Sequence, residues 1–164
     1  MDPRDLKDGS GEVRIAIGAD HAGYPLKEAV KVHLIAGGHD VTDAGTHSLD
    51  SVDYPLIAAA VAQDVANGHA EAGVLVCGTG LGMAIAANKV PGVRAVQVGD
   101  VAFAEMARRH NDANVVTLAG RSIGADAAFG IVDAFLATAF EGGRHQHRVD
   151  QISGLECRPA PTAS

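Results

Sequence analysis

Short apolar runs alternate along the chain with longer stretches in which apolar positions recur every three or four residues. The short runs are rich in valine and isoleucine and stop at glycine or polar residues, as buried strands do. The longer stretches have the spacing of amphipathic helices. The predicted strands are Val13–Ile17, His39–Asp43, Ala72–Val76, Val93–Val98 and Val115–Ala119. The predicted helices are Tyr24–Ala36, Tyr54–Ala66, Gly82–Asn88, Val101–Arg109, Ala125–Thr138 and a further piece within Phe140–Gln151.

Strands that are each followed by a helix predict a parallel sheet with helices on both faces. We therefore expect an α/β fold of three layers (α/β/α), with a five-stranded parallel sheet in a Rossmann-like arrangement. A single domain is expected over residues 13–152, between disordered ends at 1–12 and 153–164. Ligands of such sheets bind beyond the carboxyl ends of the strands, so candidate site residues should follow each strand directly.

Composition narrows the class of protein further. Hydrophobic residues make up 47% of the chain but aromatic residues only 4%, so aliphatic side chains and 20 glycines must do the packing. The net charge of -7 argues against a nucleic-acid partner, which would require a basic surface. Two cysteines are too few for a disulfide framework, and no apolar segment suits a signal peptide or a membrane span. A cytoplasmic location is expected, with no membrane partner.

The loop after the third predicted strand carries a thiol and three alternating glycines, Cys77, Gly78, Gly80 and Gly82. Glycines let a backbone approach a ligand closely, and amides at a helix start bind anions and favour the thiolate form of a nearby cysteine. The loop could thus supply both a base and a cradle for negative charge. A buried, inert cysteine beside a turn is an equally good interpretation of the loop alone.

A dinucleotide-binding turn is a further interpretation of this loop. Asp100 ends the next strand about 20 residues on, where such sites hold a ribose. The spacing of the glycines is G-x-G-x-G, however, whereas the dinucleotide fingerprint is G-x-G-x-x-G. A proton-transferring site is therefore the preferred interpretation.

Polar residues follow other predicted elements as well. Asp20 and His21 come after the first strand, where they could contact sugar hydroxyls or a phosphate, although Asp20 could equally cap the next helix. His110 follows the fourth helix and could move a proton near neutral pH. A histidine that only interacts with the helix dipole is the commoner outcome at such a position.

Arg144 and Arg148 are four residues apart, so a helix would place them on one face. Paired guanidinium groups suit phosphate recognition, although a solvated basic turn is the commoner role of such a pair. Arg121 follows the fifth strand and could add a third positive group. We expect the arginines, His110 and the Cys77 loop to meet at one edge of the sheet. The eight histidines include no two that are four residues apart beside a carboxylate, so neither a metal site nor a cofactor is expected.

Together, and in this order, these motifs resemble one family: the B-type ribose-5-phosphate isomerases and the related galactose-6-phosphate isomerases. The resemblance covers about residues 13–152. Each motif is weak alone, but six in register are specific. The matching stretches are Gly18–Gly23, Val52–Pro55, Cys77–Gly80, Ala86–Lys89, His110–Asn114 and Glu141–His145.

The resemblance implies roles for several residues in and near the matching stretches. Cys77 would be the base that moves a proton between C1 and C2 of a phosphorylated sugar through a cis-enediolate, and His110 would open the furanose ring. Thr79 and the amides of Gly78–Met83 would hold the enediolate oxygens. Met83 stands where a minority branch of the family has a glutamate, so the chain resembles the cysteine branch. The residues implied in substrate binding are Asp20, His21, Gly78, Gly80, Leu81, Gly82, Asn111, Arg121, Arg144 and Arg148.

The resemblance also implies an assembly and a substrate class. In the family the site is shared between two subunits, so a homodimer or a dimer of dimers is expected. Ribose 5-phosphate is the first expected substrate. The stretch Gln97–Asp100 departs from many relatives beside the site, which leaves tetrulose 4-phosphates and allose or galactose 6-phosphate open. A non-catalytic nucleotide-binding module is the alternative from another class.

Overall fold

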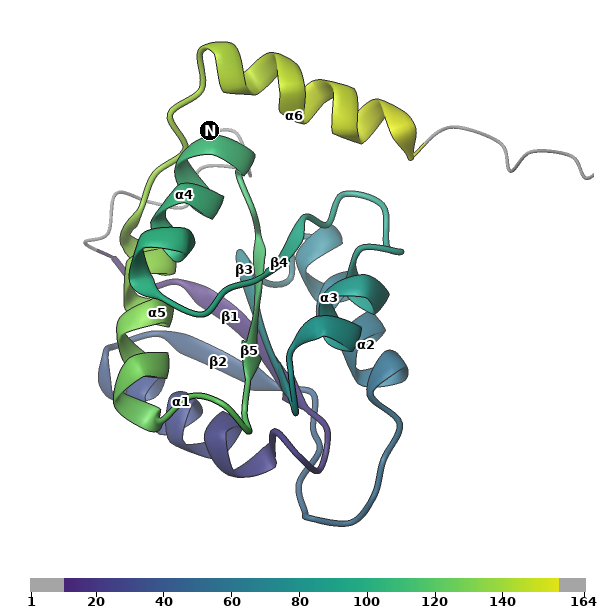
Figure 1. Cartoon of the computed structure of the whole chain (residues 1–164), viewed down its shortest axis with the longest axis vertical. Helices are drawn as coiled ribbons and strands as arrows, with labels where there is room; N and C mark the ends of the chain where they lie inside the picture. Colours follow the sequence, from purple (N-terminus) through teal and green to yellow (C-terminus); the bar gives the residue numbers. More distant parts are fainter. Residues whose placement is uncertain (1–10, 157–164) are drawn as a thin grey trace, which may run out of the picture.

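The computed structural model describes residues 11–156 and has a five-stranded parallel sheet at its centre (Figure 1). The strand order is β2-β1-β3-β5-β4, and each neighbouring pair is parallel. The strands are β1 (Arg14–Ala19), β2 (Asp40–Asp43), β3 (Ala72–Cys77), β4 (Ala95–Gln97) and β5 (Val115–Ala119). The helices are α1 (Tyr24–Ala36), α2 (Tyr54–Ala66), α3 (Leu81–Ala87), α4 (Val101–Asn111), α5 (Ala125–Ala137) and α6 (Arg144–Leu155).

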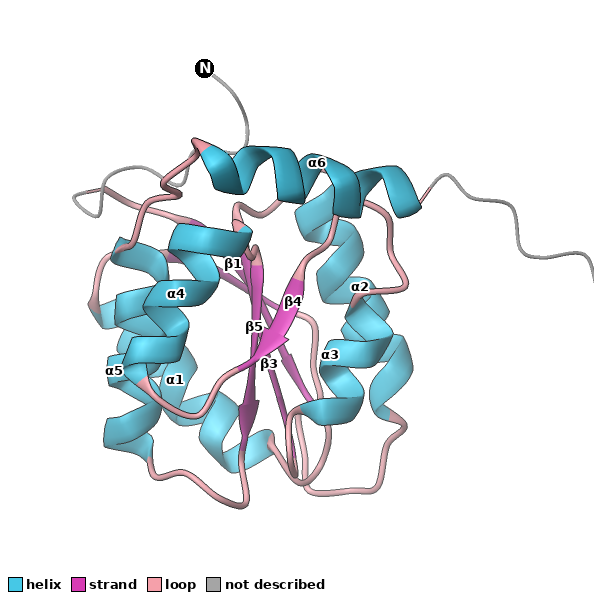
Figure 2. Ribbon diagram, turned by 45° about the horizontal axis from the view of Figure 1, so that its top comes forward, coloured by secondary structure: helices cyan, strands magenta, loops and turns pink. Residues whose placement is uncertain are grey.

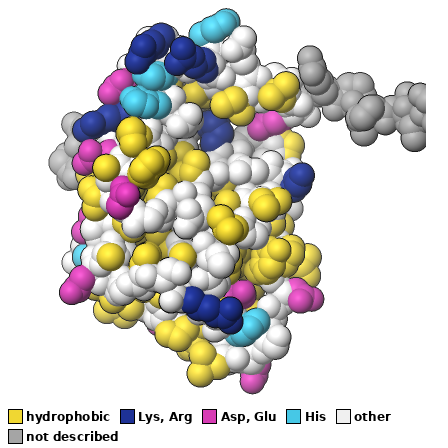
Figure 3. All heavy atoms as spheres, in the orientation of Figure 1, with side chains coloured by type: hydrophobic (Ala, Val, Ile, Leu, Met, Phe, Trp, Pro, Cys, Tyr) yellow, Lys and Arg dark blue, Asp and Glu magenta, His cyan; other side chains and the backbone are white. Residues whose placement is uncertain are grey.

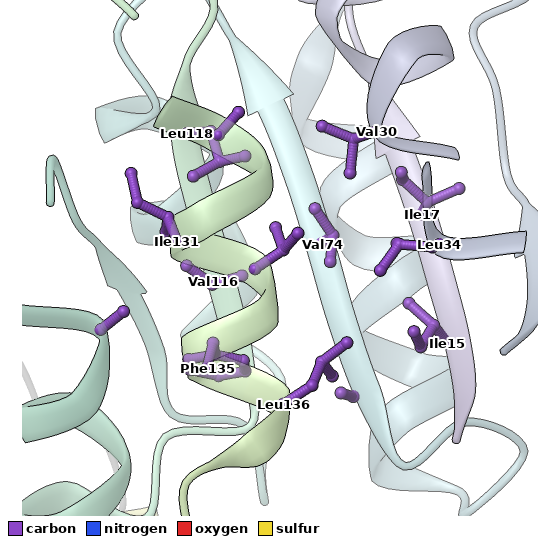
Figure 4. Packing of buried hydrophobic residues seen from close by; sticks show 14 of the residues in the cluster. Ile15, Ile17, Val30, Leu34, Val74, Val116, Leu118, Ile131, Phe135 and Leu136 are labelled. Atoms are coloured by element: carbon purple, nitrogen blue, oxygen red, sulfur yellow. The ribbon is translucent and has the colours of Figure 1, made fainter. Parts of the chain in front are cut away.

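Helices cover both faces of the sheet, which confirms the predicted three-layer fold (Figure 2). Alternate side chains of a strand point to opposite faces, so Val74 and Val76 of β3 enter one core cluster while Leu75 and Cys77 enter the other. The first cluster packs against α1, α4 and α5, as Figure 4 shows for Val30 and Ile131. The second packs against α2 and α3. The Cys77 side chain therefore lies on the α2 and α3 side of the sheet.

The predicted and observed elements differ mainly at the edge of the sheet and at the last helix. β4 has three residues because it is an edge strand with β5 as its one partner, and the flanking Val93 and Val98 are buried outside the ladder. α6 starts at Arg144 after Gly142 and Gly143, whose φ values of 65° and 55° are accessible to glycine. It continues to Leu155, so residues that the sequence assigns to the tail are helical.

α6 lies at the end of the molecule opposite the carboxyl ends of the strands (Figure 1). It packs against α4, and His145 and Val149 are its buried residues. None of the helices within residues 11–156 is long and apolar enough to cross a membrane. The predicted disorder of residues 1–10 and 157–164, and with it Cys157, falls outside the described part of the chain.

Candidate active site

β3 ends at Cys77, and the glycine loop that follows folds back over the sulfur. The backbone N–H of Gly80 donates a hydrogen bond to Sγ of Cys77 over 3.1 Å. Gly80 has φ 77°, and its carbonyl accepts a hydrogen bond of 2.6 Å from Oγ1 of Thr117 on β5. A side chain at Gly80 would be strained by this backbone conformation and would also crowd Leu118. The glycine is therefore needed to aim an amide at the sulfur.

Two residues from neighbouring elements contact the same loop, Gln97 and Arg121. Thr79 accepts a hydrogen bond from the N–H of Leu81 at its hydroxyl and from Nε2 of Gln97 at its carbonyl, both over 3.3 Å. Arg121 lies across the loop: a Cβ atom added to Gly78 would be 3.3 Å from its Nη1. Pairing of Cys77 with Ala119 in the β3–β5 ladder brings Arg121 there. Gln97, in the stretch expected to influence the choice of substrate, thus contacts the loop itself.

Asp20 and His21 follow β1 and lie next to the end of β3, because Ala19 pairs with Val76. Oδ1 of Asp20 accepts a 3.0 Å hydrogen bond from the N–H of Gly23, the residue before α1. The cap considered for Asp20 is wrong, because Gly23 is the N-cap of α1 and no side chain caps it; Asp20 closes the turn before the helix instead. At 7% exposure the residue borders a cleft. Nδ1 of His21 accepts from the N–H of Val52 over 3.3 Å, so its Nε2 is the protonated nitrogen in the neutral ring.

The cleft has a volume of about 500 Å³ and lies between β1 and the segment that leads into α2. Tyr54 joins it to the glycine loop, since a Cβ atom at Gly82 would be 2.5 Å from its ring. Asp53 precedes α2 but makes no side-chain cap to it. The cleft residues between Ser51 and Leu56 were not among the predicted site residues, although Val52–Pro55 is one of the matching stretches. The lining residues are Asp20, His21, Ser51, Val52, Asp53, Tyr54, Pro55 and Leu56.

Gly23 is the point where the β1–α1 turn touches β3. A Cβ atom there would be 2.3 Å from the carbonyl oxygen of Val76, a contact with backbone that cannot rotate away. We expect Gly23→Ala to lower the free energy of unfolding by about 1–3 kcal/mol, as overpacking does, and to reduce turnover by displacing Asp20 from Cys77. Gly124, which precedes α5 with open space around it, is the matched position. Urea unfolding should show Gly124→Ala near wild type; equal stability of the two variants would refute the contact.

His110 and the arginine pair lie elsewhere. His110 is in the last turn of α4, and its ring stacks on that of His145 with centroids 4.4 Å apart and planes 12° apart. Nε2 of His145 is 3.6 Å from Oε2 of Glu141. Arg144 and Arg148 are exposed on α6. Burial, then the nearby His110 and Arg144, lower the pKa of His145 below its ordinary value, so His110 stacks on a neutral ring at neutral pH.

The turn that carries His110 and Asn111 is held rigidly by two arginines. Arg108 is 1% exposed and donates to Oδ1 of Asp112 over 3.0 Å. Nε of Arg94 donates to the carbonyl oxygens of Asn111 and Asp112 over 3.1 and 2.8 Å. Asp112 itself has φ 45°, an uncommon conformation that these bonds stabilise. Asn111 is exposed, so its amide is directed by the turn rather than by packing.

The expectation that all the candidates meet at one edge of the sheet is wrong for this chain. A helix between parallel strands returns to the amino edge, so a residue at its end lies opposite the carboxyl edge. β5, about 17 Å long at 3.3 Å per residue, separates His110 from Arg121. Lys or Arg and histidine side chains accordingly gather at both ends of the molecule (Figure 3).

The chain therefore carries two groups of candidates. The carboxyl-edge group combines Cys77 and its loop with residues from the ends of β1 and β5: Asp20, His21, Cys77, Gly78, Thr79, Gly80, Leu81, Gly82 and Arg121. The amino-edge group consists of His110, Asn111, Arg144 and Arg148.

Comparison with known proteins gives one consistent result. The family model described as Ribose/Galactose Isomerase matches residues 15–152. Ribose-5-phosphate isomerase B of Escherichia coli K12 is 46% identical over 145 residues, which are 88% of this chain and 97% of that protein. A ribose 5-phosphate isomerase structure from Thermotoga maritima is 50% identical with a TM-score of 0.86 over 88% of this chain and 99% of that one.

A structure of ribose-5-phosphate isomerase B from Mycoplasma genitalium with bound ribulose-5-phosphate is 43% identical, with a TM-score of 0.84. That match covers 87% of this chain and 95% of the other. The similarity thus extends over nearly the whole described fold and includes both groups of candidate residues. The chain belongs to the ribose/galactose isomerase family, in its ribose-5-phosphate isomerase B branch.

Proposed function

We propose that this protein interconverts ribose 5-phosphate and ribulose 5-phosphate, with Cys77 as the base. The observation that carries the proposal is the sulfur at the end of β3 with the N–H of Gly80 directed at it, in a chain of this family. An amide donor stabilises negative charge on sulfur, and the thiolate is the form that can accept a proton.

The reaction moves one proton from C2 to C1 and one from O2 to O1, and it needs no oxidant. His110 takes the proton of the C1 hydroxyl and returns a proton to the ring oxygen, which opens the furanose. The Cys77 thiolate then removes the proton from C2, and the electron pair forms the C1–C2 double bond of a cis-enediolate. The thiol returns the proton to C1 as the C2–O⁻ electron pair forms the C2 carbonyl, and the proton of the C2 hydroxyl passes to O1, which leaves the ketose. The hydroxyl of Thr79 and the loop amides stabilise the enediolate oxygens, where the negative charge develops.

The phosphate supplies the binding energy that holds C1 and C2 against the sulfur. Arg144 and Arg148 lie four residues apart on an exposed helix face, and Arg121 and His21 lie at the carboxyl edge. Guanidinium groups bind phosphate oxygens in pairs, which suits this set.

A homodimer would complete the site. His110 and the arginine pair are separated from Cys77 by the length of β5, so one copy alone cannot bring them to the same sugar. A two-fold dimer that places the amino-edge group of one copy against the carboxyl edge of the other forms two identical sites. Exposed apolar side chains at the starts of three helices around the carboxyl edge suit such a contact: Leu56, Leu81, Val101 and Phe103. A dimer of dimers is compatible with this arrangement. The cytoplasmic location of the protein is a separate prediction.

A coupled assay over a panel of sugar phosphates tests the substrate. We expect kcat/KM for ribose 5-phosphate to exceed that for allose 6-phosphate, galactose 6-phosphate and tetrulose 4-phosphate by at least roughly 10-fold, a difference that one or two lost polar contacts provide. A higher value for any of the other sugars would reassign the substrate and implicate Gln97, which contacts Thr79. Thermal stabilisation by NAD or AMP but not by ribose 5-phosphate would support a nucleotide-binding module instead.

A further inference from the structure

Three potential metal ligands from two distant segments meet beside α6. His110 ends α4, while Glu141 and His145 flank the start of α6, and their ligand atoms all lie within 4.8 Å of one another. No other group of three histidine, cysteine or acidic residues between residues 11 and 156 comes this close. We propose that His110, Glu141 and His145 bind a divalent transition-metal ion of the zinc class, and that the ion inhibits the isomerase by occupying His110.

Binding requires one imidazole to turn, because the His110 and His145 rings are stacked with planes 12° apart and their in-plane lone pairs do not meet at one point. Zinc bonds of about 2.0–2.2 Å at tetrahedral angles place ligand atoms roughly 3.3–3.6 Å apart. Nε2 of His145 and Oε2 of Glu141 are already 3.6 Å apart. The Glu141 side chain is 52% exposed and free to rotate, whereas that of His145 is 9% exposed and held by its surroundings. Metal binding would therefore turn the His110 ring out of the stack and order the Glu141 carboxylate, while His145 stays in place.

The donor set selects the class of ion. Two imidazole nitrogens and one carboxylate oxygen suit zinc, cobalt, nickel and copper, whereas magnesium and calcium prefer oxygen ligands throughout. Three protein ligands also leave a position open to water or to a substrate oxygen. Arg144 and Arg148 add positive charge nearby and weaken the binding. The ion and a sugar phosphate should compete because both need the His110 ring under the proposed function.

A second histidine–carboxylate pair in the chain serves as a control. Nε2 of His33 lies 2.8 Å from Oδ1 of Asp133, and its ring stacks on Phe129 with centroids 4.2 Å apart. The arrangement is the same as at His145, except that the stacked ring is a phenyl group without a donor atom. This pair offers two ligands instead of three, so it should bind the ion far more weakly.

Cobalt titration tests the site directly, because four- or five-coordinate Co²⁺ absorbs strongly in the visible range. The full chain with Cys77→Ala and Cys157→Ala excludes thiolate ligands. We expect this protein to bind one Co²⁺ per chain, with Zn²⁺ displacing it. Adding Glu141→Gln or His145→Gln should weaken binding by roughly 10-fold or more, and adding Asp133→Asn should leave it unchanged. Binding unaffected by both Glu141→Gln and His145→Gln, or abolished by Asp133→Asn, would overturn the proposal.

The inhibition rests on the proposed function, whereas the binding does not. Zn²⁺ should inhibit wild-type turnover, and Glu141→Gln should keep the basal rate while requiring roughly 10-fold more Zn²⁺ for half inhibition. Equal sensitivity of the two proteins would show that the ion acts elsewhere and would refute the inhibition. A protein that binds Co²⁺ at this site but isomerises no sugar phosphate would refute the proposed function and leave the metal site standing.

Discussion

Replacing Cys77 by alanine should lower kcat by roughly 10²–10⁴-fold or more, because the variant lacks the proposed base that moves the proton between C2 and C1. The loss should appear in kcat and kcat/KM alike, since the arginines proposed to bind the phosphate are untouched. Cys77 is 5% exposed and its removal deletes one buried atom, so the variant should stay folded. Ribulose 5-phosphate should therefore still raise its melting temperature.

Two further variants make this result specific. Cys77→Ser keeps the volume and the contact with the N–H of Gly80, but its hydroxyl holds its proton near neutral pH, so it should be nearly as inactive as Cys77→Ala. Cys157→Ala removes the other cysteine of the chain and should retain full activity. Substantial turnover by either Cys77 variant would assign the proton transfer to another group.

The fold was predictable because local and global signals agree in most elements. The apolar run of Ala72–Val76 is buried throughout as β3, and Tyr24–Ala36 and Tyr54–Ala66 are helical over the predicted ranges. Proline and glycine mark the ends of these helices unambiguously. The sequence is less informative about β4, since Val93 and Val98 are buried in the core like strand residues but lie outside the three residues that pair with β5.

The candidate site was predictable at the carboxyl edge and not beyond it. Residues that directly follow a strand, such as Asp20 and Cys77, are placed by the sheet register alone. His110 follows a helix, and the direction of that helix carries it to the opposite edge. Motifs that belong to one family therefore need not lie close together within one folded chain.

The sequence also does not predict that His110, Glu141 and His145 lie close together. Spacing rules detect ligands within one helix, whereas His110 and His145 are brought together by the packing of α6 on α4. The two left-handed glycines before α6 set its starting angle, and no sequence pattern gives that angle. Tertiary packing alone decides whether the three side chains meet.

The second large effect concerns the division of the site between two copies. Cys77→Ala and His110→Ala should each be nearly inactive as pure proteins, because each impairs every site. A hybrid dimer with one copy of each variant is different. If the site joins the carboxyl edge of one copy to the amino edge of the other, one of its two sites carries both substitutions and the other carries neither.

Co-expression of the two variants with different affinity tags, followed by two-step purification, isolates this hybrid. Its activity with ribose 5-phosphate should recover to about half that of wild type per dimer. A matched hybrid of two differently tagged Cys77→Ala copies should stay inactive. A purified Cys77→Ala/His110→Ala hybrid no more active than its parents would contradict a shared site, and with it the account of how Cys77 and His110 act on one sugar.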